Sequence, residues 1–177
     1  NMARWTEKHI PDQSGRIAVV TGANGGLGAE TVRALATRGA HVVMACRTLS
    51  KGEAIAAPLM ASGASVEVVA LDLADLRSVR ACVTDLRQRH PSIDLLILNA
   101  GIMAIPRRTT AQGHEMQLGT NHIGHFAFCA GLLGQVTDRV VTVSSQAHRT
   151  SGIRWADPMS ERRYNKWQAY GQSKLAN

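Results

Sequence analysis

The sequence predicts an α/β fold, a doubly wound parallel sheet with helices packed on both of its faces. Strand-like and helix-like segments alternate from residue 15 to residue 177, which is typical of βαβ units. The strand-like segments are short, continuous apolar runs, as expected for parallel strands that are buried on both faces. A glycine-rich turn separates the first strand from the first helix. We therefore expect one three-layer α/β/α domain over residues 15–177.

Five apolar, β-branched runs are the expected strands, at residues 17–20, 41–45, 66–71, 94–98 and 139–144. Apolar residues at helical spacing predict helices over about 29–38, 75–89 and 112–133, and a last helix from about Trp167. A further helix is expected to begin near Ser50. Pro58 is expected to disrupt or end it, because proline lacks an N–H donor and clashes with the preceding turn.

Residues 1–14 are expected to form an arm on the surface of the domain. They lack the apolar core of a signal peptide, and Asn1 before Met2 has the look of a tag remnant. No run of the sequence approaches the ~20 apolar residues of a membrane span. The cysteines are far apart and lack metal-ligand spacing, so we expect reduced, buried, inert thiols in a cytoplasmic protein. They are Cys46, Cys82 and Cys129.

The composition is that of a globular protein with a basic surface. Hydrophobic residues make up 45% of the chain, charged residues 19%, and the net charge is +7. A basic balance can indicate nucleic-acid binding. Here the basic residues are scattered, with short clusters at Arg107-Arg108 and Arg162-Arg163 and no interleaved aromatic residues. We expect no nucleic-acid partner, and a basic surface that suits an anionic cofactor.

The glycine-rich turn runs from Thr21 to Gly28 with the spacing Thr-Gly-x-x-x-Gly-x-Gly. Glycines at these points let the backbone approach a ligand closely, and the N-terminus of the following helix attracts a pyrophosphate. A tight strand-to-helix loop without a ligand is the alternative interpretation. The turn predicts a Rossmann-like dinucleotide site, to which Gly22, Asn24, Gly26, Leu27 and Gly28 contribute.

The second strand is followed by Arg47, and no acidic residue occurs until Glu53. Sites for NAD carry a carboxylate in this region, which binds the ribose hydroxyls of adenosine. A guanidinium instead pairs with a 2′-phosphate, and the Lys51 ammonium can help to neutralise the same phosphate. The alternative is an ordinary surface arginine. We expect NADP(H) to be preferred over NAD(H).

Polar and small residues follow the third and fourth strands, at Asp72-Leu73 and Asn99-Ala100-Gly101. Ligands of open α/β sheets bind outside the carboxyl ends of the strands, so these stretches are expected at the same rim as the glycine-rich turn. Small side chains there let the backbone approach a ribose or a flat ring. Asp72 has the alternative role of a helix cap or a loop residue.

Tyr170 and Lys174 are four residues apart, which places them on one face of a helix. A nearby ammonium stabilises a phenolate and makes tyrosine usable as an acid–base group near neutral pH. A plain surface pair is the common meaning of this spacing. A catalytic role gains support from Ser144-Ser145, because a hydroxyl at the end of the fifth strand can bind a substrate carbonyl beside the tyrosine.

The motifs occur together in one order: Thr21-Gly22-x-x-x-Gly26-x-Gly28, Asp72, Asn99-Ala100-Gly101, Asn121, Ser145 and Tyr170-x-x-x-Lys174. In this order they resemble the short-chain dehydrogenase/reductase family over residues 15–177. The resemblance implies that Tyr170 is the general acid/base and that Ser145 orients the carbonyl or alcohol. It also implies that Lys174 binds the nicotinamide ribose and tunes Tyr170, and that Asn121 holds a water in a proton relay. Ser144 is expected to face the sheet.

Three further stretches resemble the retinol dehydrogenase branch and related NADP-dependent reductases: Ala45-Cys46-Arg47, Asn121-His122-x-Gly124-His125-Phe126 and Ser144-Ser145-x-Ala147-His148. We expect an oxidoreductase that transfers hydride between NADP(H) and a small-molecule substrate, an apolar carbonyl or alcohol. A non-catalytic NADP-sensing or regulatory protein on the same fold is the alternative. A lyase or isomerase of a related branch would more usually show another glycine spacing.

Other expectations concern assembly, length and metals. The resemblance implies a homodimer or homotetramer, and a polypeptide of roughly 250–320 residues that continues beyond Asn177 with more of this domain. The sequence would then be incomplete at its C-terminus. Three histidines could suggest a metal, but no third ligand with suitable spacing accompanies His122 and His125. We expect His114, His122 and His125 to serve in helix packing or at the surface, with no metal.

Overall fold

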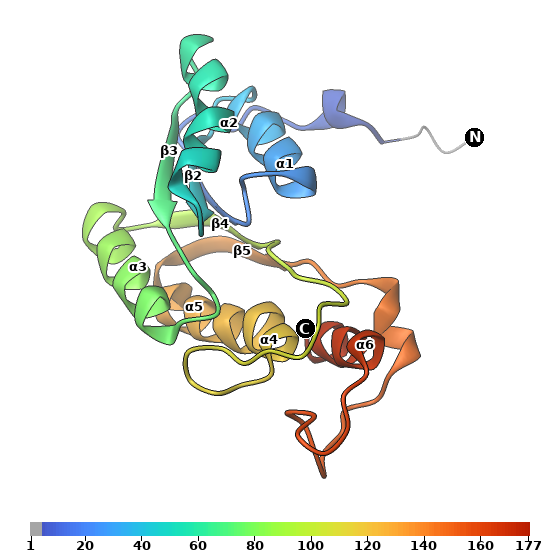
Figure 1. Ribbon diagram of the computed structural model, residues 1–177. Helices are drawn as coiled ribbons and strands as arrows, with labels where there is room; N and C mark the ends of the chain where they lie inside the picture. Colours follow the sequence, from blue (N-terminus) through green and yellow to red (C-terminus); the bar gives the residue numbers. More distant parts are fainter. Residues whose placement is uncertain (1–4) are drawn as a thin grey trace.

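The computed structural model describes residues 5–177 (Figure 1), so the interpretation of Asn1 as a tag remnant concerns a residue outside this range. Its centre is a five-stranded sheet in which every neighbouring pair is parallel. The strand order is β3-β2-β1-β4-β5. The strands are β1 (Ile17–Thr21), β2 (His41–Cys46), β3 (Val66–Ala70), β4 (Ile93–Leu98) and β5 (Val136–Thr142).

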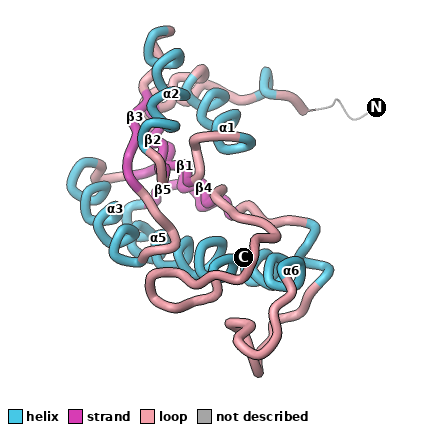
Figure 2. Tube along the Cα trace, in the orientation of Figure 1, coloured by secondary structure: helices cyan, strands magenta, loops and turns pink. Residues whose placement is uncertain are grey.

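Helices cover both faces of the sheet, as Figures 1 and 2 show. They are α1 (Gly26–Ala36), α2 (Leu49–Ala61), α3 (Leu76–Arg89), α4 (Met116–Leu118), α5 (His125–Leu132) and α6 (Lys166–Ala176). Helices α1 and α2 pack on one face, and α3 and α5 on the other. The predicted doubly wound α/β fold is therefore confirmed.

Two apolar cores lie on opposite sides of the sheet. Successive side chains of a strand point to opposite faces, so Val19 belongs to the core under α3 and α5, and Val20 to the core under α1 and α2. Both side chains are fully buried. Burying each contributes about 1.5–3 kcal/mol. Strand β5 is different, because it lies at the sheet edge and most of its residues are exposed.

Helix α2 passes through Pro58 and continues to Ala61, so of the two expected effects of Pro58, ending the helix is wrong, and a local disruption is what proline can cause there. Proline removes one hydrogen bond, the one to the carbonyl of residue 54, but its fixed φ suits a helix. The next turn is intact, since the N–H of Ser62 donates to the carbonyl of Pro58 over 3.2 Å. Ala54 and Pro58 are both exposed, so water can reach the carbonyl that loses its partner.

The segment predicted as one helix over 112–133 starts later and has an irregular middle. Residues 110–114 form a turn, in which the N–H of Thr110 donates to the carbonyl of His114. The Gln112 side chain instead accepts a hydrogen bond from the N–H of Leu76 at the start of α3. Helix α4 begins after Glu115, which caps it, and a π-helical segment, Gly119–Gly124, leads into α5. Such segments are frequent at functional sites.

The three cysteines are free thiols. Burial raises the pKa of the Cys46 thiol to about 11 and that of Cys82 to about 12. The expectation of buried thiols holds for these two, whereas Cys129 is only partly buried. Across residues 5–177, no helix has both the length and the apolar character needed to cross a bilayer.

Candidate active site

A cleft of about 400 Å³ lies at the carboxyl ends of β1, β2 and β4. This volume is within the range of small-molecule sites. The cleft is also where the strand order reverses, the usual ligand position in open α/β sheets. Of the predicted cofactor residues, those that line it are Gly22, Asn24, Leu27, Gly28, Arg47, Asp72, Leu73, Asn99, Ala100 and Gly101. Gly26, Tyr170 and Lys174 do not line it.

The glycine-rich turn is compact because its backbone packs against the loop after β4. At Gly22 a Cβ atom would lie 2.8 Å from the Cα of Ala100, and φ is +64°. At Gly28 a Cβ atom would lie 2.3 Å from the carbonyl oxygen of Gly22 and 2.6 Å from Nδ2 of Asn99. Only glycine fits both positions, so the floor of the cleft is bare backbone that a ligand can approach.

Gly28→Ala should lower the free energy of unfolding by about 1–3 kcal/mol, because the new methyl group meets a fixed carbonyl. Gly25→Ala is the matched control in the same turn. Its Cβ would have open space, and the Gly25 backbone is extended, with φ 168°. Urea unfolding of the two variants checks this. Equal stability of both variants would show that the turn is not packed as described.

Asn99 holds the turn to the loop that follows β4. Its Nδ2 donates to the carbonyl of Thr21 over 2.9 Å, while the Thr21 hydroxyl accepts the N–H of Asn99 at 2.9 Å and that of Ala100 at 3.0 Å. Asn99 therefore lines the cleft, but its side-chain amide N–H is already hydrogen-bonded to the Thr21 carbonyl. Its contribution to ligand binding is to fix the backbone of both loops.

His125 extends this network to the π-helical segment. Its Nδ1 donates to the carbonyl of Asn121 over 2.9 Å, so Nε2 accepts from the Thr21 hydroxyl over 2.8 Å. The ring is fully enclosed, and burial lowers the pKa of His125 to about 4. His125 thus serves in packing, as the sequence indicated.

Arg47 directly follows β2 and is exposed at the cleft. No acidic side chain within residues 5–177 forms an ion pair with it. Lys51 lines the same part of the cleft. Two cations that pair with no acidic side chain of residues 5–177, beside the glycine-rich turn and the N-terminus of α1, form a site suited to phosphate.

Asp72 lies at the cleft and also has the loop role considered from the sequence. It lines the cleft, and its Oδ1 also accepts the N–H of Ala74 over 2.9 Å, which shapes the loop before α3. Leu73 lines the cleft beside it and packs against the π-helical segment, because a Cβ at Gly124 would lie 2.2 Å from the Leu73 carbonyl oxygen.

Asn121 is fully buried in the π-helical segment, and its side chain makes three hydrogen bonds to protein groups. Oδ1 accepts the N–H of Ile102 over 2.8 Å, and Nδ2 donates to the carbonyl of Ile102 and to the hydroxyl of Ser173. The side chain thus ties the loop after β4 to α6. Nδ2 has both of its protons in these bonds, whereas Oδ1 accepts one hydrogen bond and has a second lone pair.

Lys174 connects α6 to the cleft. Its Nζ donates to the carbonyl of Val143 over 2.8 Å, and a Cβ at Gly101 would lie 3.5 Å from the same Nζ. The side chain is buried, and this burial lowers the pKa of the Lys174 amine. Tyr170 lies one helical turn earlier on α6 and is partly buried.

A second hollow of about 490 Å³ adjoins the end of β5. Ser145 and Lys174 both line it, which brings two of the predicted catalytic residues together. The hydroxyl of Ser145 accepts the N–H of Ala147 over 3.2 Å. Ser144 does not face the sheet as expected, because its hydroxyl donates to the Lys174 carbonyl over 2.7 Å. The remaining lining residues are Ser144, Gln146, His148, Leu175 and Asn177.

Some residues of the cleft were not singled out from the sequence. Thr48 and Ile102 each follow a predicted site residue at the end of a strand, so position alone could have indicated them. Thr120 carries no such signal. It reaches the cleft because the π-helical segment folds back over the ends of the strands.

Comparisons with known proteins agree with this geometry. A protein of Streptomyces lividans described as a probable oxidoreductase is 47% identical over 173 residues, which are 94% of this chain and 57% of that protein. Bovine retinol dehydrogenase 12 is 43% identical over 169 residues, which are 92% of this chain and 54% of that enzyme. The chain thus spans little more than half the length of the curated relatives it matches.

A solved structure and a family match point the same way. The crystal structure of an uncharacterized protein from Mycobacterium paratuberculosis superposes with a TM-score of 0.90 and 50% identity. The alignment covers 97% of this chain and 62% of that one. The short chain dehydrogenase family matches residues 16–157. The chain therefore belongs to the short chain dehydrogenase family.

Proposed function

We propose that this protein is an NADP(H)-dependent oxidoreductase that interconverts a carbonyl and an alcohol. One observation carries the proposal: the cleft with the glycine-rich turn and Arg47 adjoins Nζ of Lys174, through Gly101. The cleft suited to phosphate and helix α6, which carries Tyr170 and Lys174, therefore meet at Gly101. Family membership supports the class of reaction.

The described residues fit a dinucleotide. The bare backbone at Gly22 and Gly28 leaves room for the pyrophosphate at the start of α1, where N–H groups and the helix dipole favour an anion. Arg47 and Lys51 would hold a 2′-phosphate on the adenosine ribose. Gly101 would allow the nicotinamide ribose close to the Lys174 amine. When bound, the cofactor supplies or accepts the hydride.

The proton and the orientation of the substrate would come from this chain. In the direction of reduction, the Tyr170 hydroxyl gives its proton to the carbonyl oxygen as that oxygen gains negative charge. The Ser145 hydroxyl donates a hydrogen bond to the same oxygen and fixes its position. The Lys174 ammonium stabilises the phenolate that remains, and a water held by Asn121 would return the proton to Tyr170.

The small-molecule substrate we propose is an apolar carbonyl or alcohol. Leu175 lines the hollow beside Ser145, and Trp155 and Trp167 are 85% and 55% exposed. The name of the bovine relative, retinol dehydrogenase 12, fits an apolar alcohol. A homodimer or homotetramer and a cytoplasmic location both stay predictions.

Turnover tests the proposed function. Purified full-length protein should oxidise NADPH, followed at 340 nm, in the presence of apolar aldehydes or ketones, and should reduce NADP⁺ with the matching alcohols. A panel that varies chain length and ring size would define the substrate class. NADPH binding without turnover of any panel member would instead indicate a non-catalytic nucleotide sensor.

Arg47→Ala should weaken NADPH binding selectively. Loss of a charge-assisted contact to the 2′-phosphate costs about 1.5–3 kcal/mol, which is roughly 10- to 150-fold in Kd. NADH lacks this phosphate, so its Kd should hardly change. Calorimetric titration of both cofactors into the wild type and the variant measures the effect. An equal loss for NADH would place Arg47 outside the phosphate site.

A further inference from the structure

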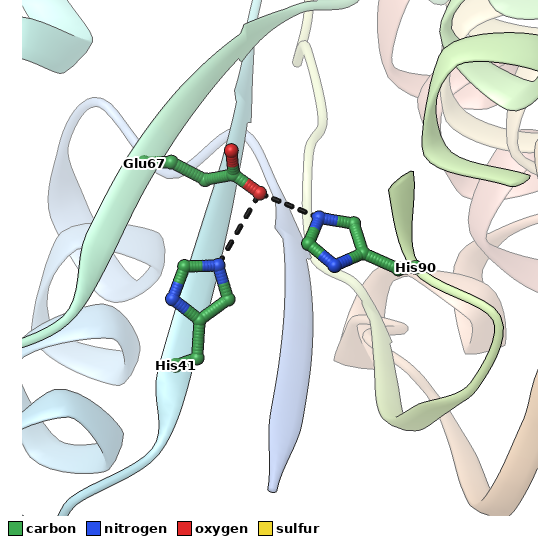
Figure 3. A group of neighbouring side chains, drawn as sticks. All are labelled: His41, Glu67 and His90. Atoms are coloured by element: carbon green, nitrogen blue, oxygen red, sulfur yellow. Dashed lines mark hydrogen bonds and ion pairs between the residues drawn. The ribbon is translucent and has the colours of Figure 1, made fainter. Parts of the chain in front are cut away.

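A group of three side chains lies at the amino ends of the strands, on the edge of the sheet opposite to the cofactor cleft. His41 begins β2, Glu67 is the second residue of β3, and His90 follows α3. Figure 3 shows both imidazole rings directed at one carboxylate oxygen. Nε2 of His90 lies 2.6 Å and Nε2 of His41 lies 3.3 Å from Oε1 of Glu67. We propose that this group binds a divalent transition-metal ion of the Zn²⁺ type.

The donor set suits such an ion. Imidazole nitrogen and carboxylate oxygen are ordinary Zn²⁺ ligands, at about 2.0–2.2 Å from the metal. A tetrahedral ion at that distance holds its donor atoms roughly 3.5 Å apart. The three donor atoms of this group lie within 4.8 Å of one another, so small side-chain rotations bring them onto one ion.

Neighbouring groups orient two of the ligands. The Ser65 hydroxyl lies 2.7 Å from Nδ1 of His41, which leaves Nε2 directed at Glu67. Nη1 of Arg89 donates to Oε2 of Glu67 over 2.5 Å, so Oε1 is the oxygen available to a metal. Partners of this kind fix the rings and carboxylates of metal sites.

The local charge favours a cation despite the arginine. Arg89 is shared between Glu67 and Asp85, with Nη2 2.6 Å from the Asp85 carboxylate. One guanidinium and two carboxylates leave a net charge of −1 beside two imidazoles. A cation at the centre of the group would therefore be attracted, even though Arg89 lowers its affinity.

The site is accessible on one side and enclosed on the other. The His41 and Glu67 side chains are 31% and 27% exposed, and that of His90 is 11% exposed. An ion can reach the group from solvent, and a water can fill the fourth position. Without metal, N–H···O hydrogen bonds hold the same three side chains. When the ion binds Nε2 of a neutral ring, the proton of that ring would be carried by Nδ1 instead, where at His41 it can be donated to the Ser65 hydroxyl. A bound ion would cross-link β2, β3 and the end of α3, and would stabilise the fold independently of the proposed activity.

Zn²⁺ titration of the untagged, metal-stripped full-length protein against a chromophoric chelator tests the proposal. We expect one ion per chain, and Co²⁺ should give the intense visible absorption of four-coordinate cobalt. His41→Gln and His90→Gln should each weaken Zn²⁺ binding by more than tenfold. Ser65→Ala keeps all three ligands and should weaken it about tenfold.

His114→Gln is the matched control, because His114 is partly exposed and lies outside this group. It should bind Zn²⁺ as the wild type does. Zn²⁺ should also raise the thermal midpoint of the wild type and of His114→Gln, but not that of His90→Gln. Circular dichroism of the metal-stripped variants checks that each is folded. Absence of one-to-one binding, or binding that survives in both His41→Gln and His90→Gln, would overturn the proposal.

Discussion

Tyr170→Phe is expected to lower kcat by about 10²–10⁴-fold, because the variant lacks the proton that general acid catalysis delivers to the substrate oxygen. Cofactor binding should be intact, since the residues of the main cleft are unchanged. Steady-state turnover at saturating NADPH, together with a separate NADPH titration, measures the two properties. A selective loss of kcat with an unchanged Kd is the expected signature.

Tyr164 provides the matched control. Its hydroxyl donates to the carbonyl of Ile105 over 2.8 Å and accepts from Nε2 of Gln117 over 2.9 Å. Tyr164→Phe therefore removes a hydroxyl of the same kind from a structural contact, and should retain kcat while losing some stability. Near-normal turnover by Tyr170→Phe would mean that another group supplies the proton.

Acid should destabilise the fold through His125. Burial holds the pKa of this imidazole at about 4, against about 6.5 in the unfolded chain. The unfolded state therefore binds more protons between these two values, and stability must fall as the pH falls. The contribution is fully present above about pH 6.5 and is lost progressively down to about pH 4. Its full size is about 3 kcal/mol.

Urea unfolding of the wild type and of His125→Asn at several pH values isolates this contribution. Asparagine cannot take up a proton, so the variant should be less stable at pH 7 but should lose less stability on acidification. Identical slopes for His125→Asn and the wild type would show that His125 is not held neutral.

Much of the sheet and cleft follows from local patterns. The short apolar runs around Val19 and Leu96 favour strands buried on both faces, and parallel strands bring their carboxyl ends to one edge. Positions after strands, such as Arg47 and Asp72, were therefore placed correctly at one cleft. The glycine spacing predicts a tight strand-to-helix turn, and the structure gives the reason: a Cβ atom at Gly28 would collide with the carbonyl oxygen of Gly22.

The structural details that the sequence did not predict depend on how each segment lies in the folded protein, either exposed to water or bonded to a distant residue. Pro58 stays inside α2 because that side of the helix is exposed to water. Gln112 leaves its expected helix because its side chain binds the start of α3. The irregular turn at Asn121 follows from bonds to Ile102 and Ser173, which are distant in sequence. None of these contacts leaves a periodic pattern.

The group of His41, Glu67 and His90 was also not visible from the sequence. Its members are separated by more than twenty residues at each step, so no ligand spacing marks them. The pairing of β2 with β3 and the return of the chain after α3 bring them together.

Titration of the wild-type protein with NADPH and NADH under identical conditions tests the central claim most directly. That claim is that the cleft at the carboxyl ends of the strands holds NADP(H), with Arg47 on the 2′-phosphate. We predict saturable binding of one NADPH per chain, with a Kd at least about tenfold lower than that of NADH. Absence of saturable NADPH binding, or an equal Kd for the two cofactors, would contradict it.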